Sequence, residues 1–248
     1  MTIKGLKINY KTLGEGRPLL ILHGWGSKSE NWQRVGEFLI EKGLKVIIPD
    51  LPGFGNSQEP PQSWGLADYC QFIKEFVNSL NLEKFYLLGH SFGGALAVKC
   101  SLEFPEKIEK LFLVDAACFR RKAFRKRLFY IIAKIFKIFS FLPFYSFFRK
   151  AFYKFIVGKS DYPYTEGVMK DIYLKIIKED LSKILPQVQV PTIIIWGEED
   201  KIKQIKEARL INQKIKNSHL EIIPSIGHNP HSEAPEKLSE TIIKFLRP

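Results

Sequence analysis

Short runs of apolar residues alternate with longer helix-type patterns along most of the chain. Each run holds four or five residues, mostly branched aliphatic or aromatic, which is typical of strands covered on both faces. These runs fall at residues 18–22, 45–48, 84–88, 110–114, 192–196 and 219–223, after a strand pair around Gly5. Helical spacing falls between them, at residues 29–42, 67–80, 94–102, 205–214 and 236–246. The alternation predicts an α/β fold, with a mostly parallel twisted sheet of about eight strands and helices on both faces.

The alternation is interrupted by an insertion at residues 118–185, which divides a core domain made of residues 1–117 and 186–248. Between Ala116 and Ser160 there are twelve Lys and Arg residues and no Asp or Glu. The whole chain has 38 basic and 26 acidic residues, so this stretch carries the entire net charge of +12. An electrostatic role would therefore belong to the insertion and not to the core. This distribution argues against a nucleic-acid-binding fold.

The motif Gly89-His90-Ser91-Phe92-Gly93 lies where a strand pattern meets a helix pattern. A serine on a tight strand-to-helix turn is projected forward, and flanking glycines remove side chains that would collide with nearby backbone. The hydroxyl of Ser91 would also lie at the positive end of the following helix, which favours negative charge developing there. The motif predicts that Ser91 is a nucleophile.

Polar residues follow three other strand patterns, as expected for a site at the carboxyl ends of parallel strands. They are His23-Gly24-Trp25-Gly26, Gly197-Glu198-Glu199-Asp200 and Gly227-His228. A serine hydroxyl needs an imidazole as base and a carboxylate that orients the imidazole. The chain supplies serine, aspartate and histidine in that order.

Together these motifs resemble the α/β-hydrolase superfamily, in its small esterase-like branch with a helical cap. The resemblance covers nearly the whole chain outside residues 118–185. It is carried by His23-Gly24, the loop Pro52-Gly53-Phe54-Gly55-Asn56-Ser57, the motif at residues 89–93, Trp196 to Asp200, and Gly227-His228-Asn229-Pro230-His231.

The resemblance implies Ser91 as nucleophile, Asp200 as acid and His228 as general base. It also implies an oxyanion hole formed by the backbone N–H groups of Trp25 and Phe92. The side chains of Trp25, Phe92 and His90 are then expected to bind substrate. No metal, nucleotide or organic cofactor is required by this chemistry.

Some alternatives remain open at this point. Asp115 is a rival for the acid, since some resembling proteins place their acid after that strand. His231 is the rival of His228, but Gly227 favours His228, and His231 is expected beside the site or on the surface. His23 is expected to fix the oxyanion loop, and His219 to be exposed.

The serine favours acyl transfer, because resembling enzymes that transfer alkyl groups have aspartate at this position. We expect hydrolysis of carboxylic esters of short to medium chain. The alternatives are lactones, including acyl homoserine lactones, esters linked to a carrier protein, and carbon–carbon bonds. A ligand sensor with the same fold is the alternative that is not an enzyme.

The insertion, which corresponds to the cap of resembling enzymes, is both basic and aromatic. It could dock an anionic membrane surface or an acidic carrier protein, or simply cover the pocket while its charges keep the outer face soluble. Cys70, Cys100 and Cys118 have no metal-like spacing and are expected to be buried thiols. The N-terminus has no signal-peptide pattern, from which a cytoplasmic location is expected.

Overall fold

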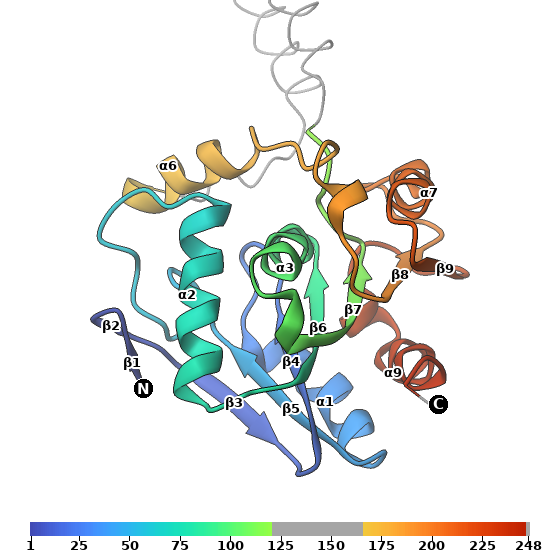
Figure 1. The fold of residues 1–248 in the computed structure, drawn as a ribbon, viewed down its shortest axis with the longest axis horizontal. Helices are drawn as coiled ribbons and strands as arrows, with labels where there is room; N and C mark the ends of the chain where they lie inside the picture. The colour runs from blue at the N-terminus through green and yellow to red at the C-terminus, as the bar shows by residue number, and fades with distance from the viewer. Residues whose placement is uncertain (121–165, 247–248) are drawn as a thin grey trace, which may run out of the picture.

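One twisted sheet forms the centre of the protein (Figure 1). The computed structural model describes residues 1–120 and 166–246. In the described part of the chain the strand order is β3-β5-β4-β6-β7-β8-β9, and only β3 runs antiparallel to its neighbour. The strands are β3 (Tyr10–Leu13), β4 (Arg17–Leu22), β5 (Leu44–Pro49), β6 (Phe85–His90), β7 (Ile108–Val114), β8 (Thr192–Gly197) and β9 (Ser218–Ile223). The mostly parallel sheet is confirmed.

The first strand pair does not join this sheet. Strands β1 (Thr2–Ile3) and β2 (Leu6–Lys7) form a separate two-stranded hairpin around Gly5, which has a left-handed φ of +78°. The main sheet therefore has seven strands among the described residues, close to the expected eight.

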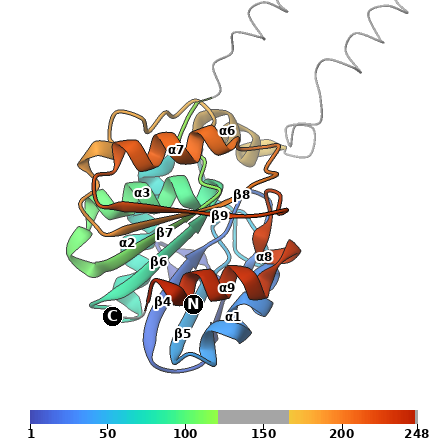
Figure 2. The same ribbon diagram turned by 90° about the vertical axis from the view of Figure 1, so that its right-hand side faces the viewer.

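Helices cover both faces of the sheet, as Figure 2 shows from the side. One face is covered by α2, α3 and α7, and the other by α1 and α9. The described helices are η1 (Ser29–Trp32), α1 (Gln33–Ile40), α2 (Leu66–Ser79), α3 (Phe92–Glu103), η2 (Pro105–Lys107), α6 (Gly167–Ile176), η4 (Leu185–Gln187), α7 (Ile205–Lys214), α8 (Pro230–Glu233) and α9 (Pro235–Lys244).

The strands are buried on both sides, which explains their continuous apolar runs. Successive side chains of a strand point to opposite faces. In β4, Leu20 and Leu22 therefore belong to the core under α2 and α3, whereas Leu19 and Ile21 belong to the core under α1 and α9. The carboxyl ends of the parallel strands meet at the edge of the sheet nearest α6 (Figure 1).

The two described ends of the insertion meet at its base. The carbonyl oxygen of Cys118 accepts a hydrogen bond from the N–H of Leu181 (2.9 Å), and the N–H of Arg120 donates to Asp180 Oδ2 (3.1 Å). Helix α6 packs on the core through buried Met169 and Ile172. Most of the basic and aromatic stretch, at residues 121–165, lies outside the described residues, so its cap and docking roles stay predictions.

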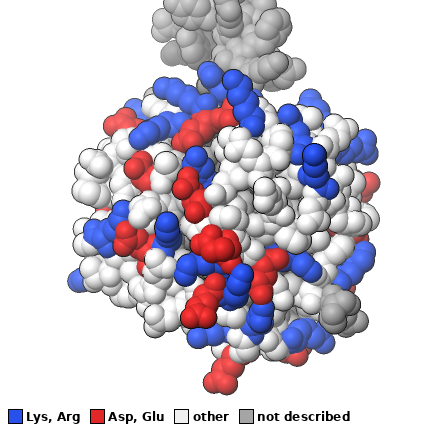
Figure 3. All heavy atoms as spheres, viewed as in Figure 1, with Lys and Arg blue, Asp and Glu red and all other residues white. Residues whose placement is uncertain are grey.

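Charges of both signs are interspersed on the face seen in Figure 3, where Lys and Arg gather along the upper rim. This agrees with the balanced charge of the chain outside the insertion. Among the described residues, none of the helices has the length and apolar character needed to cross a membrane.

Candidate active site

Ser91 occupies a strained backbone conformation between β6 and α3. Its φ is +50° and its ψ is −112°, in a region that residues other than glycine rarely adopt. The N–H of Ser91 donates to the carbonyl oxygen of Val114 (3.0 Å), and its own carbonyl oxygen accepts from the N–H of Ala117 (2.9 Å). Strain of this kind persists when the surrounding structure fixes it, and it gathers at functional sites.

The glycines on either side of Ser91 are required by close backbone approaches. A Cβ atom at Gly89 would overlap the carbonyl oxygen of Gly93, and one at Gly93 would overlap the carbonyl oxygen of Leu22. The start of α3 therefore lies directly against the end of β4. The sequence-based reason given for these glycines is confirmed.

Ser91, His228 and Asp200 form one chain of hydrogen bonds. Nδ1 of His228 lies 2.7 Å from Asp200 Oδ2, and Nε2 of His228 lies 3.0 Å from Ser91 Oγ. A carboxylate can only accept, so Nδ1 donates to Asp200 and leaves Nε2 to accept the proton of Ser91. The structure thus brings together the three residues that the sequence singled out.

Asp200 is held as an ionised carboxylate. Its side chain is buried, with 6% of the residue exposed, and Oδ1 accepts hydrogen bonds from the N–H groups of Ile202 (2.7 Å) and Lys203 (2.8 Å). Burial alone would raise the pKa of Asp200, but the hydrogen bonds from His228 and from these backbone groups outweigh it and lower the pKa. Oδ2 therefore presents negative charge to His228.

Glu233, which the sequence analysis missed, clamps the turn that carries His228. Its Oε2 accepts from the N–H of Gly227 (2.6 Å) and its Oε1 from the N–H of Asn229 (3.0 Å). His90 also holds this turn, because its Nε2 donates to the carbonyl oxygen of His228 (2.8 Å). The only signal in the sequence for Glu233 is an acidic residue a few positions after the Gly-His pair.

The expected oxyanion donors are two backbone N–H groups near Ser91. Among the described residues, the backbone N–H groups of Trp25 and Phe92 donate to no protein oxygen. Phe92 is the first residue of α3, and a Cβ at Gly24 would lie 3.4 Å from the Cβ of Ser91, so both segments border the serine. Their role in binding an oxyanion stays a prediction.

His23 fixes the loop that carries Trp25. Its Nδ1–H donates to the carbonyl oxygen of Gly24 (2.8 Å), and its Nε2 accepts from the N–H of Leu51 (3.0 Å). Burial lowers the pKa of His23 to about 4, so the ring is neutral at pH 7 and this donor–acceptor pattern is kept. The geometry agrees with the structural role expected for His23.

Asp50 ties the neighbouring loops together and was also missed. It accepts hydrogen bonds from the N–H groups of Ser29 (2.6 Å) and Asn56 (2.9 Å) and from Asn9 Nδ2 (2.8 Å). Burial acts to raise the pKa of Asp50, but these donors lower it. The ionised carboxylate links the segment after β4, through Ser29, to the loop after β5, through Asn56.

An aromatic cluster surrounds Trp25. Its ring contacts Phe54 (4.9 Å between centroids), Phe92 (5.6 Å) and Tyr173 of α6 (5.1 Å). Trp25 and Tyr173 are each half-buried, whereas Phe92 is buried beneath them. Tyr173 was not anticipated, because no pattern in the insertion pointed to one residue.

The other histidines are placed as follows. His90 is only 2% exposed and packs against the rings of His228 and His231, so it supports the site from within, and substrate contact by His90 stays a prediction. His231 is not a surface residue: it is 5% exposed and stacks on Trp32 at 4.6 Å. Burial lowers its pKa to about 4. His219 is exposed, as expected.

Asp115, the rival acid, lies next to the triad, but Nδ1 of His228 donates to Asp200 instead. Its Oδ1 accepts from the N–H of Gly197 (3.0 Å). Side-chain ligand atoms of Asp115, Asp200 and His228 lie within 4.8 Å of one another, a spacing a metal ion could use. The hydrogen bond between His228 and Asp200 accounts for the closeness of two of the three residues. Cys70, Cys100 and Cys118 are buried and free, as expected.

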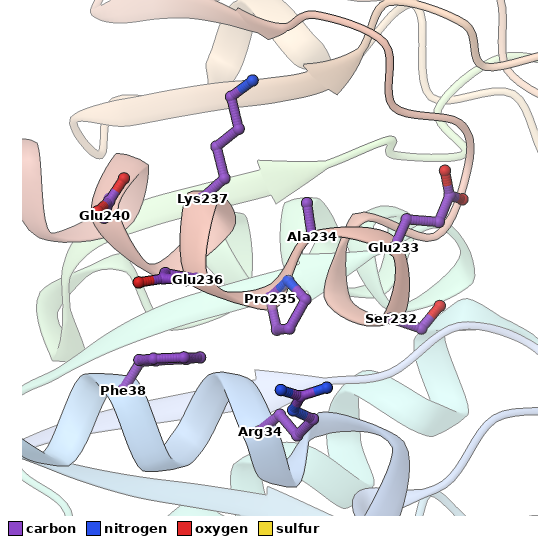
Figure 4. A pocket seen from close by; sticks show the side chains of 9 residues that line it. All are labelled: Arg34, Phe38, Ser232, Glu233, Ala234, Pro235, Glu236, Lys237 and Glu240. Atoms are coloured by element: carbon purple, nitrogen blue, oxygen red, sulfur yellow. The ribbon is translucent and has the colours of Figure 1, made fainter.

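A groove of about 490 Å³ lies outside the turn that carries His228, between α1 and α9. In Figure 4, Arg34 and Phe38 of α1 face the junction of α8 and α9, whereas Glu233 points away from α1 toward the preceding loop. The groove therefore borders the clamp of His228 without reaching the triad.

This geometry agrees with comparisons to known proteins. A family model described as the alpha/beta hydrolase fold matches residues 17–151, more than half of the chain, and the protein belongs to this family. The relatives include Lipase 3 of Moraxella sp. (strain TA144), 29% identical over 88% of this chain and 74% of that protein. They also include Lipase 1 of Psychrobacter immobilis, 28% identical over 93% and 77%.

Among solved structures, an esterase from Exiguobacterium antarcticum is similar over 100% of this chain and 98% of that one. The two chains are 25% identical and superpose with a TM-score of 0.77. The protein is thus similar to lipases and esterases of the family.

We expect Gly93→Ala to destabilise the fold, because its Cβ would overlap the carbonyl oxygen of Leu22. Urea denaturation should show a free energy of unfolding lower by about 2 kcal/mol. Gly65→Ala is the matched control: its Cβ would meet only the flexible ends of Glu179 and Lys175, and the cost should stay below about 1 kcal/mol. Equal effects of the two variants would contradict the close approach.

We expect acid to destabilise the protein through its buried histidines. The pKa values of His23 and His231 are lowered from 6.5 to about 4, so the unfolded chain binds more protons between these values. Their contribution is fully present above pH 6.5 and is lost as the pH falls toward 4. Urea denaturation at pH 7 and pH 5 measures the loss, and His231→Phe, which keeps the ring stack, should reduce it. An unchanged loss in that variant would contradict the assignment.

Proposed function

We propose that this protein is a serine hydrolase that cleaves carboxylic esters of short to medium chain. The observation that carries the proposal is the hydrogen-bond chain from Ser91 through His228 to Asp200. Ser91 and His228 are partly exposed whereas Asp200 is buried, so the reacting hydroxyl and the base are open to substrate. The similarity to lipases and an esterase supports the choice of esters.

In the proposed mechanism, Ser91 attacks the acyl carbon while His228 Nε2 takes its proton. The ionised Asp200 stabilises the imidazolium and keeps Nδ1–H in place. The N–H groups of Trp25 and Phe92 bind the oxyanion, and the strained turn aims Phe92 N–H at it without reorganisation. His228 then protonates the leaving alcohol, and water repeats the sequence on the acyl-enzyme.

The aromatic cluster supports an apolar substrate group. Trp25 and Tyr173 are half-buried, and Trp25 carries one of the expected oxyanion donors on its backbone. An acyl or alcohol chain that leaves the reacting carbon on this side would pack against their rings. The same triad would serve lactones and carrier-protein esters, which the experiment below separates.

We expect p-nitrophenyl esters to be hydrolysed, with a maximum at one acyl length between two and eight carbons. Ser91→Ala should lower kcat/KM by at least about a thousandfold, because the acyl-enzyme cannot form. Ser101→Ala is the matched control: this serine lies on the same helix and donates only to the carbonyl oxygen of Val98. Release of p-nitrophenol is the measurement.

An acyl homoserine lactone and a carrier-protein methyl ester should be assayed beside the ester series. A higher kcat/KM for either would replace the ester assignment with that substrate class. A folded protein that turns over none of these substrates, or equal rates for Ser91→Ala and the wild type, would contradict the proposed function.

We also expect the clamp on the His228 turn to matter for turnover. Glu233→Ala removes the acceptor for two backbone N–H groups, so His228 should be less well placed and kcat should fall about tenfold with little change in KM. Glu236 lines the same groove, and its side chain points away from Glu233 in Figure 4, so Glu236→Ala should behave as wild type. A normal kcat for Glu233→Ala would show that the clamp is dispensable.

A further inference from the structure

Asp115 is a buried carboxyl group that the proposed mechanism does not use. It follows β7, the strand between the one that leads to Ser91 and the one that leads to Asp200. Its exposed fraction is 0%, and its φ of +44° places it, like Ser91, in the left-handed region. Ser91 and Asp115 are thus two non-glycine residues with positive φ at the same site. Such a conformation at a buried polar residue calls for an explanation.

The hydrogen bonds of Asp115 leave half of its carboxyl group without a donor. Oδ1 accepts from the N–H of Gly197 (3.0 Å), but Oδ2 is buried and has no hydrogen-bond partner among the described residues. A buried carboxylate with one N–H donor is poorly compensated. The residue would be satisfied if Oδ2 carried a proton and donated it.

The charged groups around Asp115 make an ionised form unfavourable. Among the described residues, the titratable groups that act on it or lie close to it are Asp200 after β8, Glu233 on α8 and His228 after β9. Burial raises the pKa of Asp115 well above its usual value, and the nearby charges of Asp200 and Glu233 raise it further against the effect of the Gly197 N–H. Two carboxyl groups this close cannot both be ionised without a large cost. Asp200 is the one with three donors, so Asp115 keeps the proton.

We propose that Asp115 is a neutral carboxylic acid whose Oδ2–H donates a hydrogen bond to the carboxylate of Asp200. Asp115 is then a positioning residue, which acts on His228 through Asp200. The donated hydrogen bond fixes the orientation of the carboxylate and spreads its charge, so that Asp200 accepts the Nδ1–H of His228 without taking its proton. The proposal rests on the triad of the proposed function.

Substitution of Asp115 tests whether it is neutral or ionised, because the two cases shift the pH dependence of kcat/KM in opposite directions. Asp115→Asn keeps a neutral group that accepts from Gly197 and donates to Asp200, so kcat should stay within about threefold of wild type. In the pH profile of kcat/KM for p-nitrophenyl butyrate, the acidic limb should stay at the same pH as in the wild type. Asp115→Ala removes the donor, leaves more charge on Asp200, and should move that limb to higher pH by about half a unit.

The opposite result would overturn the proposal. An ionised Asp115 stabilises protonated His228, so both Asp115→Asn and Asp115→Ala would move the acidic limb to lower pH. A purely structural role would lower the thermal midpoint of Asp115→Ala and leave the limb in place, which would also overturn it. Thermal unfolding of every variant therefore accompanies the kinetics.

An infrared spectrum tests the protonation state without any substrate. The wild type at pH 7 should show the carbonyl band of a buried protonated carboxyl group, which shifts with 13C-labelled aspartate and is lost in Asp115→Asn. Ser91→Ala, which has no nucleophile, should keep the band. Absence of the band in the wild type would overturn the proposal whether or not the protein hydrolyses esters, so the two failures can be told apart.

Discussion

The left-handed turn at Ser91 is the constraint on which the site depends. The start of α3 can approach β4 only because Gly93 has no side chain, and β6 can pass α3 only because Gly89 has none. The carbonyl oxygen and N–H of Ser91 are held by Ala117 and by buried Val114 at the end of β7, so the strained backbone is fixed by hydrogen bonds to its neighbours. The serine is thereby presented on a rigid support.

Strand order then decides how the other residues must reach Ser91. Ser91, Asp115, Asp200 and His228 follow β6, β7, β8 and β9, which are consecutive in the sheet. Neighbouring strands lie about 4.8 Å apart, so the carboxyl end of β9 lies roughly 14 Å from that of β6. His228 must return across two strands on an extended turn. This explains why the turn is held on both sides, by Glu233 through its N–H groups and by His90 through a carbonyl oxygen.

Much of this arrangement could be predicted from the sequence, because strand periodicity and five short motifs depend on local patterns. The buried runs at residues 18–22 and 192–196 became β4 and β8, and the proximity of Ser91, Asp200 and His228 followed from strand ends meeting at one edge. Residues that act through tertiary contacts could not be found this way. Glu233 resembles any acidic helix residue, and the burial of His231 depends on Trp32, some 200 positions away.

Burial also sorts the titratable groups of the site by charge. His23, His90 and His231 have lowered pKa values because burial disfavours their charged forms, so none of them competes for the proton of Ser91 at pH 7. His228 differs from them in having an ionised carboxylate on Nδ1 and partial exposure. A neutral Asp115 would complete this pattern. Apart from the carboxylate of Glu233 on the His228 turn, these buried neighbours of the triad would be neutral, and the positive charge that develops during acyl transfer would lie on His228 next to Asp200.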